Sequence, residues 1–256
     1  MVDRSIANIK RAHIRKLAEE GSRSDGRKFD QMRPLRIETG IIGSYNGSSR
    51  VRLGGTEVMA GIFMDTSRPY PNNPNSCTMH TKMDLNPMAS PLFGRFDMEP
   101  DIIELSRVVD RGIRGSDMID MGSLVIRPGE EVWRINMDLV VLDFDGNLID
   151  GGNLALLKAL QSTVVPASRY DLGTDHPMPI KTLPISTTFV KIGDCLLFDP
   201  TSLEESVADA RITITTDSDG IMRSLQKGGF GSFRPDEVRD AYARSVNVGE
   251  RIRKGI

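Results

Sequence analysis

The first segment of the chain has apolar residues at the spacing of a helix. They are Ile6, Ile9, Ile14 and Leu17. One face of a helix collects residues three or four positions apart, so this pattern predicts an amphipathic helix over about residues 5–20. Ser5 is a residue type favoured at helix N-termini, and Gly21 is of the type favoured just beyond C-termini.

Short segments rich in Ile, Val and Met follow, and turn-forming residues separate them. The predicted strands cover residues 36–43, 49–53 and 57–64, with Asn46-Gly47 and Gly54-Gly55 between them. Such spacing is typical of antiparallel hairpins. Several prolines between 65 and 94 predict mostly irregular structure there, apart from a strand at 78–85.

Strand and helix patterns then repeat towards the end of the chain. The predicted order is a helix from about 99 to 114, strands at 123–127 and 132–144, a helix at 152–162, strands at 183–192, 195–198 and 211–215, a turn at 218–220 and a last helix. Strands followed by a helix, twice over, predict an α+β fold with two similar halves. We expect one compact unit over residues 1–256, its halves meeting near 165–180.

Composition narrows the class of protein. The 33 basic and 35 acidic residues give a net charge of -2, which excludes a surface that is basic over most of its area. Any contact with nucleic acid must therefore be a local patch. No long apolar run occurs and the two cysteines, Cys77 and Cys195, are far apart, so we expect a soluble cytoplasmic protein without disulfides.

Familiar catalytic patterns do not occur. His13, His80 and His176 have no spacing that supports a metal site or a catalytic triad, and the glycines at 228–231 lack the residues of a phosphate-binding loop. Asp143, Asp145 and Asp150 could hold Mg²⁺, but Asp-Gly-Asn after a strand is more typical of a tight turn. We predict no metal and no cofactor.

Three arginines share one side of the predicted helix at 99–114. Arg107, Arg111 and Arg114 lie opposite an apolar face that includes Val109 and Ile113. Guanidinium groups in a row can bind successive phosphates of RNA without recognising bases. The alternative is a solvated face on which Glu104 and Asp110 pair with the arginines.

Several segments together resemble the ribonuclease PH family. They are Arg23-Ser24-Asp25-Gly26-Arg27, Arg33-Pro34, Gly54-Gly55-Thr56-Glu57-Val58-Met59-Ala60, ELSRVVDRGIR at 104–114 and VWRINMDLVVLDFDGNLIDGGNLALLKAL at 132–160. In order and spacing the chain is most similar to the non-catalytic ribonuclease-PH-like subunit of the archaeal exosome, and the similarity covers nearly its whole length.

The resemblance implies a fold with two similar βα halves, of the kind called ribosomal protein S5 domain 2-like. It also implies a hexameric ring of three heterodimers with an active paralogous subunit, joined by RNA-binding cap subunits. In such rings phosphate attacks the 3′-terminal phosphodiester of single-stranded RNA and releases nucleoside diphosphates. That reaction requires an anion site and acidic residues.

Two departures from the active pattern indicate a subunit without activity. Active relatives have a short Gly-Thr/Ser-Arg phosphate loop where this chain has residues 145–152, and Asp150 there would repel phosphate. Active members also place two aspartates six residues apart where this chain has Glu205 and Arg211. We therefore expect degenerate active-site positions at Asp150, Glu205 and Arg211, and no catalytic residues.

The sequence thus predicts a silent exosome subunit whose Arg107, Arg111 and Arg114 hold RNA for the active partner. Two alternatives stay open at this point. One is an active phosphate-dependent 3′ to 5′ exoribonuclease, and the other is an assembly scaffold that never contacts RNA.

Overall fold

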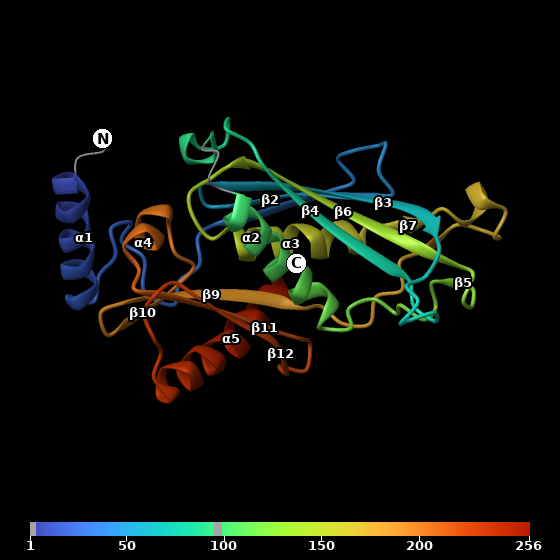
Figure 1. Ribbon diagram of the computed structural model, residues 1–256. Coiled ribbons are helices and arrows are strands. Elements are labelled where there is room, and N and C mark those ends of the chain that lie inside the picture. The colour runs from blue at the N-terminus through green and yellow to red at the C-terminus, as the bar shows by residue number, and fades with distance from the viewer. Residues whose placement is uncertain (1–3, 95–98) are drawn as a thin grey trace.

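The computed structural model describes residues 4–94 and 99–256 in four layers (Figure 1). A mixed sheet lies at the top of the view, the helices α2 and α3 lie beneath it, a second sheet follows, and α5 covers the far face of that second sheet. One hydrophobic core runs through these layers, with buried side chains from both sheets and from α2, α3 and α5.

The first sheet is built from the first 143 residues. Its elements and the segments between them are α1 (Arg4–Glu19), β1 (Leu35–Thr39), β2 (Gly47–Leu53), β3 (Thr56–Ser67), β4 (Thr78–Leu85), a 3-10 turn (Pro91–Gly94), α2 (Glu99–Arg114), β5 (Val125–Arg127) and β6 (Glu131–Asp143). The strand order is β1-β2-β3-β6-β4, with β5 paired to β6. All pairs are antiparallel except β4 with β6.

The second sheet follows the central helix α3 (Leu148–Gln161). The elements after α3 are β7 (Val164–Val165), a 3-10 turn (Ala167–Tyr170), β8 (His176–Pro177), β9 (Ile185–Ile192), β10 (Cys195–Phe198), α4 (Ser202–Val207), β11 (Ala210–Thr216), β12 (Met222–Gly228) and α5 (Pro235–Gly255). The order β10-β9-β11-β12 is antiparallel throughout. Among the described residues, no helix is long and apolar enough to cross a membrane.

The α+β prediction is confirmed, but the structure differs from the sequence prediction in several local features, among them the strand expected at 36–43, which ends at Thr39. The helix expected from 152 begins at Leu148, because Leu148 and Ile149 are already buried in its first turn. The strand β12 was not predicted, since its exposed, largely polar residues (MRSLQKG) carry little of the apolar alternation that marks a buried strand. The short helix α4 was also missed.

The helix α3 is buried almost all round because it lies between the two sheets. Its buried residues run from Leu148 to Leu157 without a break and include Ala159 and Leu160. A helix that is apolar on every side is one that has neighbours on every side. Apolar residues of α3 pack against β2 and β3, and the polar Asp150 and Asn153 reach β9.

The face of the second sheet towards α3 is lined by small hydroxyl side chains. The Thr188 hydroxyl donates to Asp150 at 2.7 Å and lies 2.9 Å from Thr213, while the Ser186 and Thr215 hydroxyls are 2.8 Å apart. Each of these side chains is almost completely buried. Buried polar groups are tolerated when they bond one another, so this layer is held by a hydrogen-bonded network in addition to apolar contact.

The N-terminal helix α1 packs against the second half of the chain. Ile14 and Ala18 are buried with Val190 and Val207 in a small separate cluster. The side chains of Ser5, Ile6 and Ile9, on which the prediction also depended, lie outside the described residues. The expected helix at 5–20 corresponds to α1 at Arg4–Glu19.

Candidate functional site

The loop between β6 and α3 is the point where the segments that resemble ribonuclease PH meet. The two-residue turn Gly54-Gly55 packs directly on this loop, and a Cβ on Gly55 would lie 2.9 Å from that of Asp145. The Thr56 hydroxyl donates to the carbonyl of Gly146 at 2.6 Å and accepts from the amide of Asp145 at 3.0 Å. The Gly-Gly-Thr sequence is therefore required to hold the loop closely.

Arg33 ties this loop to the second half of the chain. Its guanidinium donates to the carbonyl of Asp145 at 2.5 Å and to Asp199 Oδ1 at 2.8 Å, and its side chain is only 5% exposed. The side chain also crosses the turn, since a Cβ on Gly54 would lie 2.5 Å from Arg33 Cδ. Burial alone would raise the pKa of Asp199, but the hydrogen bonds and charge of Arg33 outweigh burial and lower it.

Two further arginines of the N-terminal segment are held in the same region. Arg23 Nη2 lies 2.6 Å from Glu204 Oε2, and both side chains are at most 1% exposed. Arg27 lies 3.1 Å from the carboxylate of Asp199, which Arg33 also contacts. These paired charges join the segment 23–33 to the residues just before and within α4, far away in the sequence.

The last residue of the loop, Asn147, directs its backbone amide at a carboxylate of the same chain. Asn147 has φ 56, in the left-handed region that Asn tolerates better than most residues, and lies immediately before α3. Its backbone N–H donates to Glu205 Oε1 at 3.0 Å, and its side-chain amide donates to Asp199 Oδ1 at 2.8 Å. A protein carboxylate thus occupies the place that an anion would take at this helix terminus.

Asp150 points into the protein and not into an open cleft. Its carboxylate is buried and accepts hydrogen bonds from the Asn147 side chain at 2.9 Å and from the Thr188 amide at 2.9 Å. Burial raises the pKa of Asp150 to about 7, an effect that these hydrogen bonds reduce and the nearby charge of Asp199 reinforces. Its place in the structure is therefore a junction between α3 and β9.

Glu205 and Arg211 are brought towards the same side of the loop. Burial raises the pKa of Glu205, while the Asn147 amide and the charges of Arg211 and Arg33 act in the opposite direction. Arg211 Nη2 lies 3.1 Å from Glu104 Oε1, in the second turn of α2, so an ion pair connects β11 to α2. Asp209, the other acid of this segment, pairs with Arg15 of α1 at 2.8 Å.

The three arginines of α2 differ in their surroundings. Arg107 is exposed and has no hydrogen bond or ion pair to any residue that the structure describes. Arg111 is exposed and donates to Gln226 of β12 at 2.5 Å. Arg114 donates to Asp110 at 3.0 Å and to the carbonyl of Met79 at 3.0 Å, as the solvated-face alternative predicts for Asp110.

The other candidate residues lie apart. His13, His80 and His176 are exposed on three separate elements, and in the described part of the chain no three His, Cys, Asp or Glu residues are placed to hold a metal ion. Asp145 lies in a turn, where Gly146 has φ +84 and is packed against Thr201. The backbone conformation of this Asp-Gly-Asn sequence therefore agrees with the tight turn expected from the sequence.

Sequence reasoning did not identify Asp199 and Glu204, the two acids on which the buried arginines converge. One signal was present: Thr201 and Glu204 have the spacing of a capping box, in which each side chain bonds the other's backbone amide, and the structure contains this motif at α4. Asp199 has φ 50, and its side chain bonds residues that are distant in the sequence, so no comparable local signal marks it.

Comparison with known proteins matches both halves of the chain to one family. Residues 31–166 match the 3′ exoribonuclease family, domain 1, and residues 182–246 match domain 2 of the same family, which is the ribonuclease PH family. The chain therefore belongs to the ribonuclease PH family of 3′ exoribonucleases, and the resemblance inferred from its motifs is confirmed.

Among individual relatives, similarity extends over nearly the whole chain. The exosome complex component Rrp42 of Methanocella arvoryzae is 42% identical over 91% of this chain and 90% of its own, and that of Thermoplasma acidophilum is 42% identical over 97% and 95%. A solved structure described as the Archaeoglobus fulgidus exosome with RNA bound to the active site superimposes with a TM-score of 0.94, at 39% identity and 98% coverage of both chains. An archaeal exosome core gives a TM-score of 0.90 at 36% identity, covering 100% of this chain and 99% of the other.

Proposed function

We propose that this chain is the non-catalytic ribonuclease-PH-like subunit of an archaeal exosome. In that role it forms a hexameric ring with an active paralogous subunit, carries RNA-binding cap subunits and helps to bind single-stranded RNA during 3′ to 5′ phosphorolysis in the cytoplasm. Relatives named as exosome components and the fit to archaeal exosome cores support this assembly. The continuous core supports a single unit over the whole chain, with its two sheets joined through α3.

The proposed lack of catalytic activity is supported mainly by the hydrogen bond from the Asn147 backbone amide to the Glu205 carboxylate. In active relatives the segment before this helix is a phosphate loop, whose amides must be open to an inorganic anion. Here Glu205 Oε1 accepts from Asn147 at 3.0 Å, so the negative charge at this point is supplied by the protein. A phosphate ion would have to displace a carboxylate and would be repelled by it.

The second support is the charge at position 211. A carboxylate at this place in active relatives can assist the transfer as an acid, a base or a metal ligand, whereas an arginine can do none of these. Arg211 instead forms an ion pair with Glu104 of α2. A cation paired with Glu104 thus stands at the position where active relatives have an acid.

We propose that RNA phosphates bind along α2, chiefly at Arg107 and Arg111. Arg107 has no partner among the described residues, and Arg111 gives up only one hydrogen bond, to Gln226. Arg114 belongs to the same stripe, but its guanidinium is already bonded to Asp110 and Met79, so we assign it the smallest part in binding. Contacts of this kind are independent of sequence and weaken with salt.

An activity assay on separated and recombined subunits tests this function. The purified chain, supplied with 3′-tailed RNA, Mg²⁺ and phosphate, is expected to release no nucleoside diphosphates, while the ring formed with the active subunit releases them. The matched variant Glu205→Gln, which removes the charge but keeps the size, serves as a control and is also expected to be inactive because Arg211 is unchanged. Diphosphate release by the wild-type chain alone would show that it is an active exoribonuclease.

The assembly-scaffold alternative has one observation in its favour, the pairing of Arg114 with Asp110. It predicts that RNA crosslinks in the assembled ring fall only on the partner. Crosslinks to α2 would decide for the RNA-binding role.

A further inference from the structure

Phe230 is the only fully exposed aromatic side chain in the part of the chain that the structure describes. It belongs to the glycine-rich segment 228–231, which begins at the last residue of β12. A phenylalanine that stays in water forgoes the stabilisation that burial of its ring would provide. Both faces of this ring are therefore open to another molecule.

The backbone on both sides of Phe230 is fixed to the start of β11. The amide of Gly231 donates to the carbonyl of Asp209 at 2.7 Å, and a Cβ on Gly231 would lie 2.7 Å from the same oxygen. Gly229 has φ +77, and a Cβ there would lie 3.1 Å from Ala210 Cα. Because glycine has no Cβ, the segment lies directly against β11 and holds Phe230 in an anchored, exposed position.

Cations lie beside this segment. Lys227 is exposed, its ammonium donates to a backbone carbonyl of the segment at 2.5 Å, and it has no ion pair among the described residues. A Cβ on Gly228 would lie 3.0 Å from Arg211 Nη2. The adjacent acid, Asp209, is paired with Arg15 at 2.8 Å. The surroundings of Phe230 therefore attract an anionic ligand more than an acidic or a purely apolar surface would.

The segment also continues from the strand that contacts the arginines of α2. Gln226 of β12 accepts from Arg111 at 2.5 Å, and Phe230 follows four residues later. Four residues of extended chain span at most about 14 Å. A short stretch of RNA bound to Arg111 can therefore also reach Phe230.

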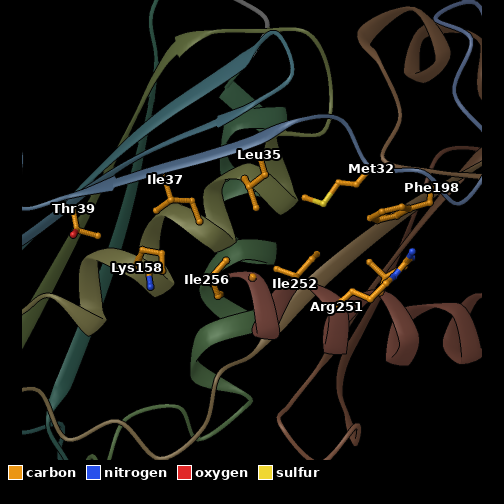
Figure 2. A pocket seen from close by; sticks show the side chains of 11 residues that line it. Met32, Leu35, Ile37, Thr39, Lys158, Phe198, Arg251, Ile252 and Ile256 are labelled. Atoms are coloured by element: carbon orange, nitrogen blue, oxygen red, sulfur yellow. The ribbon is translucent and has the colours of Figure 1, made fainter.

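The apolar cavity between β1 and the last turns of α5 lacks this combination of groups. Its volume is about 650 Å³, and Figure 2 shows Leu35, Ile37 and Ile252 around it. Arg251 adds a cation, but Phe198, the one aromatic ring in its lining, is only 1% exposed. A nucleobase stacks on an open ring face, so this cavity does not offer a comparable site.

We propose that Phe230 is a stacking site for the bases of single-stranded RNA, with Lys227 binding an adjacent phosphate. Aromatic rings beside cations suit single strands, because every base has a flat face and every nucleotide carries a phosphate. Stacking of this kind tolerates any base sequence. The proposal rests on the RNA-binding role proposed above, and it extends the RNA contacts from α2 to the segment after β12.

Binding of RNA with and without bases tests the proposal. The Kd of the assembled ring is measured in the absence of phosphate ion, so that phosphorolysis cannot proceed, for a single-stranded oligomer and for an abasic oligomer of equal length. Phe230→Ala should weaken binding of the base-bearing oligomer by about fivefold or more and leave binding of the abasic oligomer unchanged. Phe230→Tyr, which keeps an aromatic face, should retain wild-type affinity, whereas the apolar but non-aromatic Phe230→Leu should behave as Phe230→Ala does.

Charge variants separate phosphate binding from stacking. Lys227→Ala should weaken binding of both oligomers to a similar extent, as loss of a phosphate contact does. Arg251→Ala removes an exposed cation beside the cavity of Figure 2 and should change the affinity for neither oligomer. Thermal melting and the size of the assembled ring establish that each variant is folded and assembled.

Two results would overturn the stacking site. One is a Phe230→Ala ring that binds the base-bearing oligomer as tightly as wild type, or that loses the same affinity for both oligomers. The other is a folded Phe230→Ala chain that no longer assembles with the active subunit, because Phe230 would then contact protein. Arg107→Ala with Arg111→Ala tests the RNA-binding role of α2 separately, and a loss of affinity there without a loss at Phe230 would leave that role standing.

Discussion

The arginines of residues 23–33 and those of α2 carry the same charge in opposite surroundings. Arg23 and Arg33 are at most 5% exposed, and their guanidinium groups are enclosed by Glu204, Asp199 and backbone carbonyls. Arg107 is exposed with no partner in the described part of the chain. Both groups of arginines lie in motifs that resemble the same family, so the motif alone does not separate a structural arginine from a binding one.

The difference follows from what burial does to a charge. A guanidinium taken out of water must be matched by carboxylates and carbonyls with good geometry, and once matched it has no capacity left for a ligand. An exposed guanidinium costs little to keep and remains free to bind phosphate. The number and geometry of the partners, more than the residue type, thus decide which arginines stabilise the fold and which stay free to bind a ligand.

The largest effect is expected when a buried arginine loses its charge. Arg33→Met keeps much of the volume but leaves Asp199 buried without its main partner, so the free energy of unfolding should fall by about 3–5 kcal/mol. Guanidinium chloride unfolding measures this. Arg107→Met is the matched control, and a change of more than about 1 kcal/mol there would contradict the comparison.

The second prediction concerns how the free energy of unfolding depends on pH through the buried carboxyl of Asp150. Its pKa is about 7 in the folded chain, against an ordinary value of 3.8, so unfolding releases a proton between these values. The wild type should therefore lose stability relative to Asp150→Asn as pH rises from about 4 to 7, at up to about 1.4 kcal/mol per pH unit, and the difference should level off above pH 7.

Asn is a suitable replacement because it keeps the size of Asp150 and its carbonyl oxygen can still accept from the Thr188 amide. Unfolding curves for both proteins at pH 5, 6, 7 and 8 give the required differences. A difference that stayed constant over this range would mean that Asp150 is ionised throughout.

The smallest effect on the free energy of unfolding is expected for substitutions on α2. These substitutions should instead lower the affinity for RNA. Arg107→Ala with Arg111→Ala should leave the free energy of unfolding within about 0.5 kcal/mol of wild type, because both side chains are exposed. RNA affinity of the assembled ring should fall, and the slope of log K against log salt should decrease by roughly 1.4 for two lost phosphate contacts on a single strand.

Arg114→Ala is the control for the RNA measurement, since this side chain bonds Asp110 and Met79. Its expected result is slightly lower stability with nearly unchanged RNA affinity. An equal loss of affinity for Arg114→Ala would show that its ion pair opens for RNA, and unchanged affinity of the double variant would favour the scaffold role.

Some features were predictable because they depend on neighbours in the chain. Helical spacing around Val109 and Ile113 predicted α2, and apolar segments separated by Gly54-Gly55 predicted the hairpin of β2 and β3. The strand β12 was missed because an edge strand with alternating exposed side chains has a weak apolar pattern. The start of α3 was missed because Asp-Gly-Asn favours a turn locally, while the buried Leu148 and Ile149 come from long-range packing.

The candidate functional site likewise has some features that depend on local sequence and others that depend on long-range packing. Arg107, Arg111, Glu205 and Arg211 could be chosen from motifs and helical spacing. That Glu205 would accept from the Asn147 amide, 58 residues earlier, depends on how α4 is placed against the loop before α3. Such a contact has no signature in the local sequence.

By itself the sequence determined the family, the alternation of strands and helices, and the net charge of each motif, since these follow from residue type and short-range spacing. Only the tertiary structure decided which charges meet, because Arg33 and Asp199 are 166 positions apart and come together through packing of both sheets on α3. Burial then fixed their roles, since a charge out of water must be paired, whereas the exposed arginine at position 107 keeps its charge available.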